Sequence, residues 1–166
     1  MAAKTLQDLF IHELSDIYSA EKQLTKALPK MARAATNPKL SEAFQAHLEE
    51  TQGQIERIDQ VVELCDIKLK RMKCVAMEGL VEEGKEVIEE ITKGPVLDAA
   101  LIAAAQKAEH YEISSYGTLC TFARHLGFKD AEKLLYQTLQ EEKSTDEKLT
   151  KLAESESNPQ AEQKGK

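Results

Sequence analysis

Hydrophobic residues recur every three or four positions along most of the chain, which is the spacing of one face of a helix. Four long stripes of this kind cover residues 10–31, 38–65, 96–126 and 135–152. Each stripe is long enough for several helical turns, and each leaves a polar face on the other side of its helix. The pattern therefore predicts four long helices that pack around one core in a bundle.

The segment 66–95 joins the second and third stripes and carries a shorter amphipathic stretch between Cys74 and Ile91. Such a crossover lets the second and third long helices run parallel. Pro29 lies inside the first stripe and predicts a kink or a break there. The end of the chain is polar and interrupted by proline, so we expect a folded domain over 1–153 and a disordered tail over 154–166.

Composition narrows the class of protein. The 166 residues are enough for one domain, and residues that favour helices dominate, which indicates an all-α fold. With 29 acidic and 22 basic residues the net charge is -7, so we expect neither nucleic acid nor an anionic membrane as a partner. The longest apolar run has seven residues, Ala99 to Ala105, and the first ten residues do not form a secretory signal. We expect a cytoplasmic protein.

Acidic residues interrupt the apolar stripes near the middle of the four long helices. A buried carboxylate without a partner costs several kcal/mol, so acids at matched depth indicate bound cations. The spacing is similar in both halves of the chain, since Glu21 precedes Glu50 by 29 residues and Glu112 precedes Glu142 by 30. These acids predict a dinuclear metal site in the bundle core, formed by Glu21, Glu50, Glu109, Glu112, Glu142 and Asp146.

The ligand set differs from the usual one of a helical bundle, because no Glu-x-x-His motif is present. Gln54 and Asp146 stand one turn after Glu50 and Glu142, the two candidates for bridging carboxylates. His47, one turn before Glu50, and Gln54 are secondary candidates. Oxygen ligands favour hard cations, so we expect two iron or manganese ions.

Two other interpretations of the acids remain open. The stripes could be rotated about their helix axes, which would leave the acids on a solvated face. Alternatively, the layer could be free of metal, with neutral carboxyl groups that hydrogen-bond one another and Tyr18 or Tyr116.

Four segments closely resemble the YciF stress-protein family of bacteria: YSAEKQLTKALPKMA, AHLEETQGQIERIDQV, AAQKAEHYEISSYGTL and LQEEKSTDEKL. The resemblance extends over residues 5–153. It implies a ferritin-like, rubrerythrin-related fold, a homodimer and a role in the general stress response. It also implies that the six acids named above lie at the metals. The chain lacks the histidines and the cysteine-rich iron module of rubrerythrins, so their peroxidase route is in doubt.

These observations support one functional hypothesis and two alternatives. The first is a stress protein whose two metals oxidise Fe(II) or consume peroxide or oxygen. The second is a noncatalytic, dimeric interaction protein with a vestigial metal site. The third, iron storage in a hollow cage, has no specific support, because nothing in the sequence marks a multimeric shell.

Overall fold

The computed structural model describes residues 3–163 and contains no strand among them, which confirms the all-α class. The helical segments are α1 (Leu6–Ala34), α2 (Pro38–Leu64), α3 (Val75–Glu90), α4 (Pro95–His125), α5 (Lys129–Leu152), a π-helical segment (Ala153–Ser157) and α6 (Asn158–Gln163). The four long helices and the shorter helix of the crossover match those that the hydrophobic pattern predicts.

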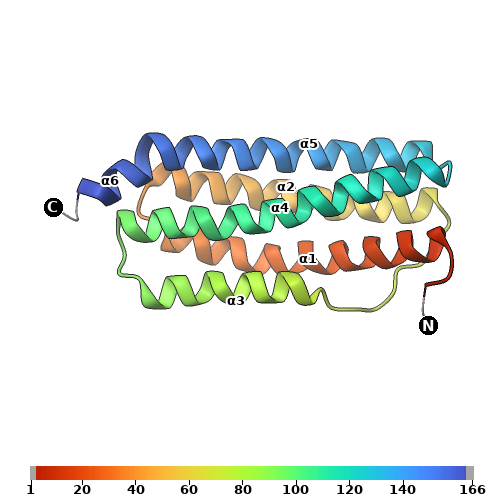
Figure 1. The fold of residues 1–166 in the computed structure, drawn as a ribbon, viewed down its shortest axis with the longest axis horizontal. Helices are drawn as coiled ribbons and strands as arrows, with labels where there is room; N and C mark the ends of the chain where they lie inside the picture. Colours follow the sequence, from red (N-terminus) through yellow and green to blue (C-terminus); the bar gives the residue numbers. More distant parts are fainter. Residues whose placement is uncertain (1–2, 164–166) are drawn as a thin grey trace.

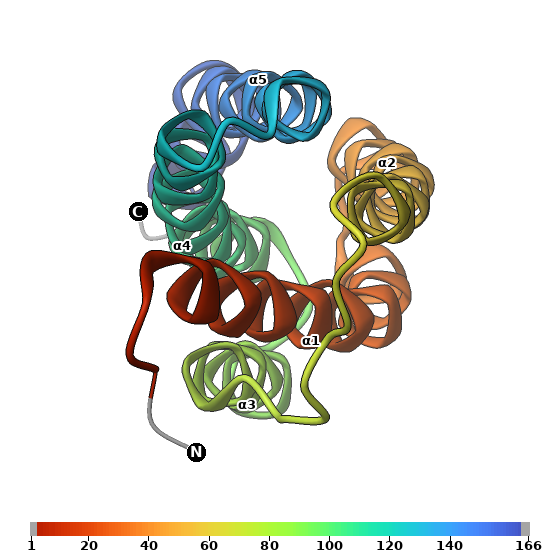
Figure 2. The same cartoon turned by 90° about the vertical axis from the view of Figure 1, so that its right-hand side faces the viewer.

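The helices α1, α2, α4 and α5 form a bundle around one core (Figures 1 and 2). In Figure 1, α1 and α2 form one antiparallel hairpin, and α4 and α5 form the other. The crossover through α3 returns the chain to the end of the bundle at which α2 begins, so α2 and α4 run in the same direction, as predicted (Figure 1). Helix α3 lies outside the bundle against α1 and α4.

The ends of the long helices follow from local sequence signals. Thr5 and Asp8 form a capping box at the start of α1. The Asn37 side chain accepts hydrogen bonds from the backbone amides of Lys39 (2.8 Å) and Leu40 (3.3 Å) at the start of α2. Gly127, with φ of 77°, follows α4 in a Schellman motif, in which the Phe128 amide donates to the Ala123 carbonyl at 2.9 Å. Glycine adopts this positive φ without strain.

The sequence predicted a kink or a break at Pro29, but α1 does not break there and continues to Ala34. Proline removes only one backbone hydrogen bond, and burial of residues on both sides holds the helix on the core. The large apolar residues of the predicted stripe of α1 are all buried: Phe10, Leu14, Ile17, Leu24, Leu28 and Met31.

The end of the chain differs from the predicted disordered tail. Residues 153–163 are helical, and they contact α4. The Glu156 carboxylate accepts a hydrogen bond from Asn37 Nδ2 at 2.7 Å and pairs with Lys39, while Ser157 is buried. These contacts tie the segment to the start of α2, which composition alone could not reveal. Residues 164–166 of the predicted tail lie outside the described part of the chain.

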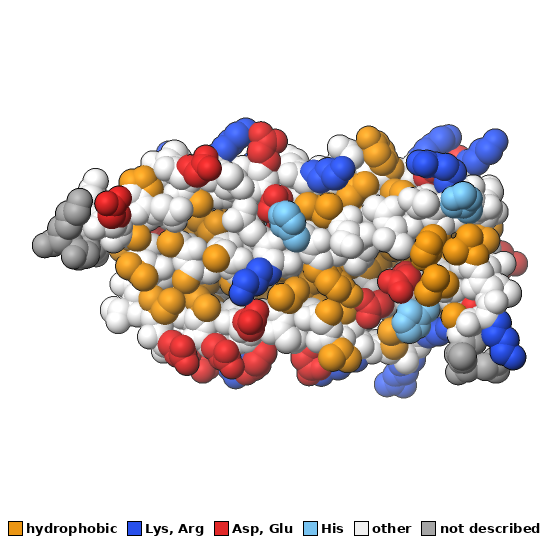
Figure 3. Space-filling model, viewed as in Figure 1, with side chains coloured by type: hydrophobic (Ala, Val, Ile, Leu, Met, Phe, Trp, Pro, Cys, Tyr) orange, Lys and Arg blue, Asp and Glu red, His pale blue; other side chains and the backbone are white. Residues whose placement is uncertain are grey.

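In the face seen in Figure 3, hydrophobic side chains spread over the middle and charged side chains lie mainly toward the edges, with acidic side chains along the edge formed by α3. Within residues 3–163, no helix is both long enough and apolar enough to span a bilayer.

Candidate metal centre

Side chains from all four long helices meet in a buried polar layer near the middle of the bundle. Helix α1 contributes Glu21, α2 contributes His47, α4 contributes Glu109 and Glu112, and α5 contributes Glu142. Their relative exposures are 4% for His47, 2% for Glu109 and 0% for the other three. The acids therefore do not lie on a solvated face, and the interpretation with rotated stripes is wrong for these residues.

The geometry of this layer suits a metal ion. His47, Glu109, Glu112 and Glu142 each offer one ligand atom, and these atoms lie within 4.8 Å of one another. The Nε2 atom of His47 is 2.8 Å from Glu109 Oε1 and 3.9 Å from Glu142 Oε2. Three carboxylates and one imidazole at such distances are a common donor set for transition metals.

Several of the buried polar atoms have no hydrogen-bond partner among the described residues. They include both carboxylate oxygens of Glu112 and of Glu142, and the Oε2 atoms of Glu21 and Glu109. The carboxyl groups contact one another, Glu21 with Glu112 and Glu109 with Glu142, and such a pair forms a hydrogen bond only when one of its members is protonated. Native proteins pair nearly all buried polar groups, because an unpaired one costs about 1–3 kcal/mol, and more when it is charged. The donor set and its unpartnered oxygens thus fit a metal, which would satisfy these oxygens.

Glu21 differs from the other acids because a tyrosine satisfies one of its oxygens. The hydroxyl of Tyr116, itself fully buried, donates to Glu21 Oε1 at 2.5 Å. Burial raises the pKa of Glu21 to about 7, against the opposing effect of the Tyr116 hydrogen bond. Tyr116 is thus one of the two tyrosines that the sequence offered as hydrogen-bond partners of the acids, and it forms such a bond with Glu21.

Burial and mutual repulsion also shift the other titrating groups. Burial is the main cause that raises the pKa of Glu112 and of Glu142 well above the usual range, and neighbouring carboxylates add to it. Burial alone would lower the pKa of His47, but the charge and hydrogen bond of Glu109, with help from Glu50, raise it to about 10. In the metal-free protein the layer thus holds protons that a metal would displace.

The structure brings some predicted ligands to the edge of this layer. The Glu50 side chain is 35% exposed; its Oε2 accepts from Thr145 Oγ1 at 3.2 Å and lies 3.6 Å from His47 Nδ1. It borders a small pocket of about 50 Å³ that reaches His47 and Glu109. Gln54 is fully buried, and its amide interacts with the carboxyl group of Glu142. Both residues can add ligands without belonging to the central group.

Asp146 lies outside the layer, although the sequence placed it among the ligands. Its carboxylate accepts from Gln106 Nε2 at 3.2 Å and lies 3.1 Å from His110 Nε2, with 22% of its side chain exposed. These contacts turn it toward the outer side of α4. His47, a secondary candidate in the sequence, is instead central, because α2 points this side chain inward and leaves Glu50 at the edge.

Comparison with known proteins identifies the family. A family model described as a domain of unknown function, DUF892, matches residues 5–162. Protein YciF of Escherichia coli is 67% identical over 165 residues, which are 99% of each chain. The chain belongs to the YciF family.

Solved structures agree with this assignment. The crystal structure of the E. coli stress protein YciF has a TM-score of 0.89 and 70% identity, covering 91% of this chain and 96% of its own. YcfI of Rhodopseudomonas palustris has a TM-score of 0.85 and 50% identity, covering 89% of this chain and 94% of its own. This YciF-family chain therefore shares its fold with these relatives.

Proposed function

We propose that the buried layer binds two iron or manganese ions, and that the protein uses them under stress to oxidise Fe(II) or to consume peroxide or oxygen. One observation carries this proposal: buried carboxylate oxygens without partners surround His47 at a single depth of the bundle. Several ionised carboxylates in one buried site repel one another, and two cations would neutralise them.

The residues of the layer divide into two groups by their contacts. His47, Glu109, Glu112 and Glu142 would hold the metals directly. Glu21 and Glu50 would complete the set from the two sides of the layer. A bound iron or manganese pair supplies electron transfer by changing between the divalent and trivalent states. Carboxylate and imidazole ligands suit both metals.

Neighbouring side chains orient the metal ligands, and the protonation of His47 controls metal binding. The Tyr116 hydroxyl donates a hydrogen bond to Glu21, and the Thr145 hydroxyl donates one to Glu50, so a neighbouring side chain helps to orient each flanking acid. His47 must lose its extra proton before it can bind a metal, because a ligating imidazole is neutral. The raised pKa of His47 therefore implies that metal affinity increases as the pH rises.

The stress role rests on similarity, since the E. coli relative is described as a stress protein. We further propose that the protein acts in the cytoplasm as a homodimer, which light scattering after gel filtration can test. A dimer mass would agree with the proposal, whereas a monomer or a cage would contradict this part of it.

Activity tests can address the proposal directly. Protein loaded with Fe(II) or Mn(II) should accelerate ferrous oxidation or the loss of peroxide, and the double variant Glu112→Gln/Glu142→Gln should not. Glu147→Gln is the matched control, since Glu147 is an exposed acid of α5 that pairs with Lys151. No acceleration by the loaded wild type, or equal activity in the double variant, would contradict the proposal.

The second candidate function is a noncatalytic interaction protein with a vestigial site. The hydrogen bond from Tyr116 to Glu21 favours this candidate, because one buried carboxylate oxygen of the layer has its hydrogen-bond partner without a metal. This candidate predicts that cells expressing Glu112→Gln/Glu142→Gln tolerate stress as well as cells with the wild type do.

A further inference from the structure

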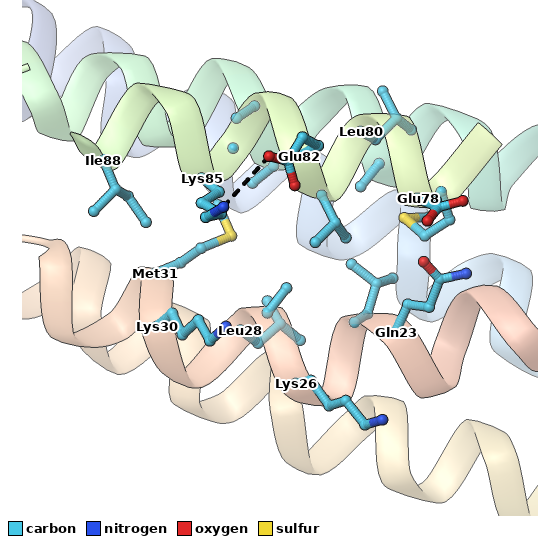
Figure 4. A pocket seen from close by; sticks show the side chains of 18 of the residues that line it. Gln23, Lys26, Leu28, Lys30, Met31, Glu78, Leu80, Glu82, Lys85 and Ile88 are labelled. Atoms are coloured by element: carbon cyan, nitrogen blue, oxygen red, sulfur yellow. Dashed lines mark hydrogen bonds and ion pairs between the residues drawn. The ribbon is translucent and has the colours of Figure 1, made fainter. Parts of the chain in front are cut away.

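A cleft of about 750 Å³ lies between α1 and α3, with its floor on α4 (Figure 4). In Figure 4, Met31 of α1 and Ile88 of α3 point into the space between the two helices. This volume falls in the range of small-molecule sites, about 300–1,000 Å³. The apolar residues of the walls and floor are Leu24, Ala27, Leu28, Met31, Ala34, Met77, Leu80, Val81, Ile88, Ala104, Ala105 and Ala108.

Small residues create this space. Gly84 is buried on α3, yet a Cβ atom built on it would meet no atom within 4 Å. Ala104, Ala105 and Ala108 form the facing floor on α4. Protein interiors are normally close-packed. Unfilled space between a buried glycine and a row of alanines therefore indicates a binding site for a ligand.

The cleft is long and aliphatic, and it ends at the metal centre. Its α1 wall extends from Gln23 to Ala34, which is about 17 Å at the helical rise per residue. No aromatic side chain is among the residues that line it, so it offers no platform for a stacked ring. His47 and Glu109 line its inner end. A linear aliphatic chain matches these walls better than a planar ring does.

The charges on the two edges of the cleft differ. On the α3 edge, Lys85 Nζ lies 3.4 Å from Glu82 Oε1 and 3.9 Å from Glu89 Oε1, so acidic side chains pair with this lysine. On the α1 edge, Lys26, Lys30 and Arg33 are exposed, and none of these side chains has an acidic partner within residues 3–163. The positive charge at the mouth is therefore available to an anion.

We propose that this cleft binds one long-chain aliphatic carboxylate, of the fatty-acid class. The chain lies between α1 and α3 with its far end toward His47 and Glu109, and the carboxylate lies at the cations of the α1 edge. The binding does not require metal.

Calorimetric titration of the full-length protein with dodecanoate, below its micelle concentration, tests the proposal. We expect one site per chain, both with and without EDTA. Dodecyltrimethylammonium has the same chain and a cationic head, and should bind at least about tenfold more weakly, as should acetate, which lacks the chain. Equal affinity for the cationic amphiphile, or no binding of dodecanoate, would overturn the proposal.

Two variants localise the site. Gly84→Leu fills the cleft and should weaken dodecanoate binding at least about tenfold. Gly79→Leu is the matched control, because Gly79 is an exposed glycine of α3 outside the cleft, also with free space at Cβ. Circular dichroism checks that both variants fold. Wild-type affinity in folded Gly84→Leu would overturn the proposal.

A third variant does not depend on the packing of the cleft. Lys30→Gln/Arg33→Gln changes only exposed side chains and should weaken binding about two- to fivefold for each charge removed. Unchanged affinity would overturn the proposed position of the carboxylate. If the wild type fails to bind dodecanoate and Gly84→Leu dissociates a dimer in sedimentation, a second copy occupies the cleft and the proposal is wrong.

Metal content separates this inference from the proposed function. Gly84→Leu should keep the wild-type metal content, since Gly84 is not in the buried layer. Dodecanoate binding by a protein that takes up no metal would refute the proposed function and leave this inference intact. Stoichiometric metal in a protein that does not bind dodecanoate would refute this inference and leave the proposed function intact.

Discussion

The protonation of Glu21 gives a direct test of the electrostatics of the buried layer. In the metal-free protein this side chain is fully buried, and burial raises its pKa from 4.5 to about 7. A group whose pKa is higher in the folded state than in the unfolded state stabilises the fold at low pH. Its contribution is complete below pH 4.5 and is lost as the pH rises through about 7.

The size of this effect follows from the pKa shift. One unit corresponds to about 1.4 kcal/mol, so the shift from 4.5 to about 7 corresponds to about 3 kcal/mol between the two ends of the titration. Glutamine at this position can still accept the Tyr116 hydrogen bond, but it does not titrate. Glu21→Gln should therefore lose this part of the pH dependence. In a chain of this size, about 3 kcal/mol corresponds to a change in Tm of roughly 6–12 °C.

Urea unfolding monitored by circular dichroism, in EDTA at pH 5 and pH 8, measures the effect. The free energy of unfolding of the wild type should fall from pH 5 to pH 8 by more than that of Glu21→Gln, and the difference should be most of the 3 kcal/mol estimated above. Glu49→Gln, an exposed change on α2, should show the wild-type pH dependence. Equal pH dependence in Glu21→Gln and the wild type would refute the reasoning.

Three further predictions concern the metal ligands and the end of the chain. Glu142→Gln should abolish metal uptake yet raise the Tm in EDTA at pH 8, because folding at this pH must either bury the Glu142 carboxylate or protonate it, and glutamine removes that cost; differential scanning fluorimetry showing a lower Tm would contradict this. Asp146→Asn should keep the wild-type metal content in elemental analysis, since its carboxylate contacts Gln106 and His110 rather than the layer; loss of metal would show that Asp146 is a ligand. Deletion of residues 154–166 should lower the free energy of unfolding by about 1–3 kcal/mol, because it removes the hydrogen bond from Asn37 to Glu156; an unchanged urea midpoint would show that the segment contributes nothing.

The helices could be predicted because their signals are local. Apolar spacing, the Asn37-Pro38 start and Gly127 at the end of α4 each depend on neighbouring residues. The helical segment after Leu152 could not be predicted in this way. Its order depends on a contact between Glu156 and Asn37, which are 119 positions apart.

The depth of the site was also predictable, but its exact members were not. Rise along a helix is fixed at about 1.5 Å per residue, so acids near the middle of four helices fall in one layer. The rotation of each helix about its axis depends on packing against its neighbours. That rotation turns His47 inward, leaves Glu50 at the edge and directs Asp146 to Gln106 and His110.

The metal content of the purified, untagged protein tests the central claim most directly. It should be measured by elemental analysis before and after anaerobic loading with Fe(II) or Mn(II), for the wild type and for Glu112→Gln/Glu142→Gln. The proposed centre predicts about two metals per chain in the loaded wild type and none in the double variant. No stoichiometric metal in the wild type under either loading, or equal metal in both proteins, would contradict the account.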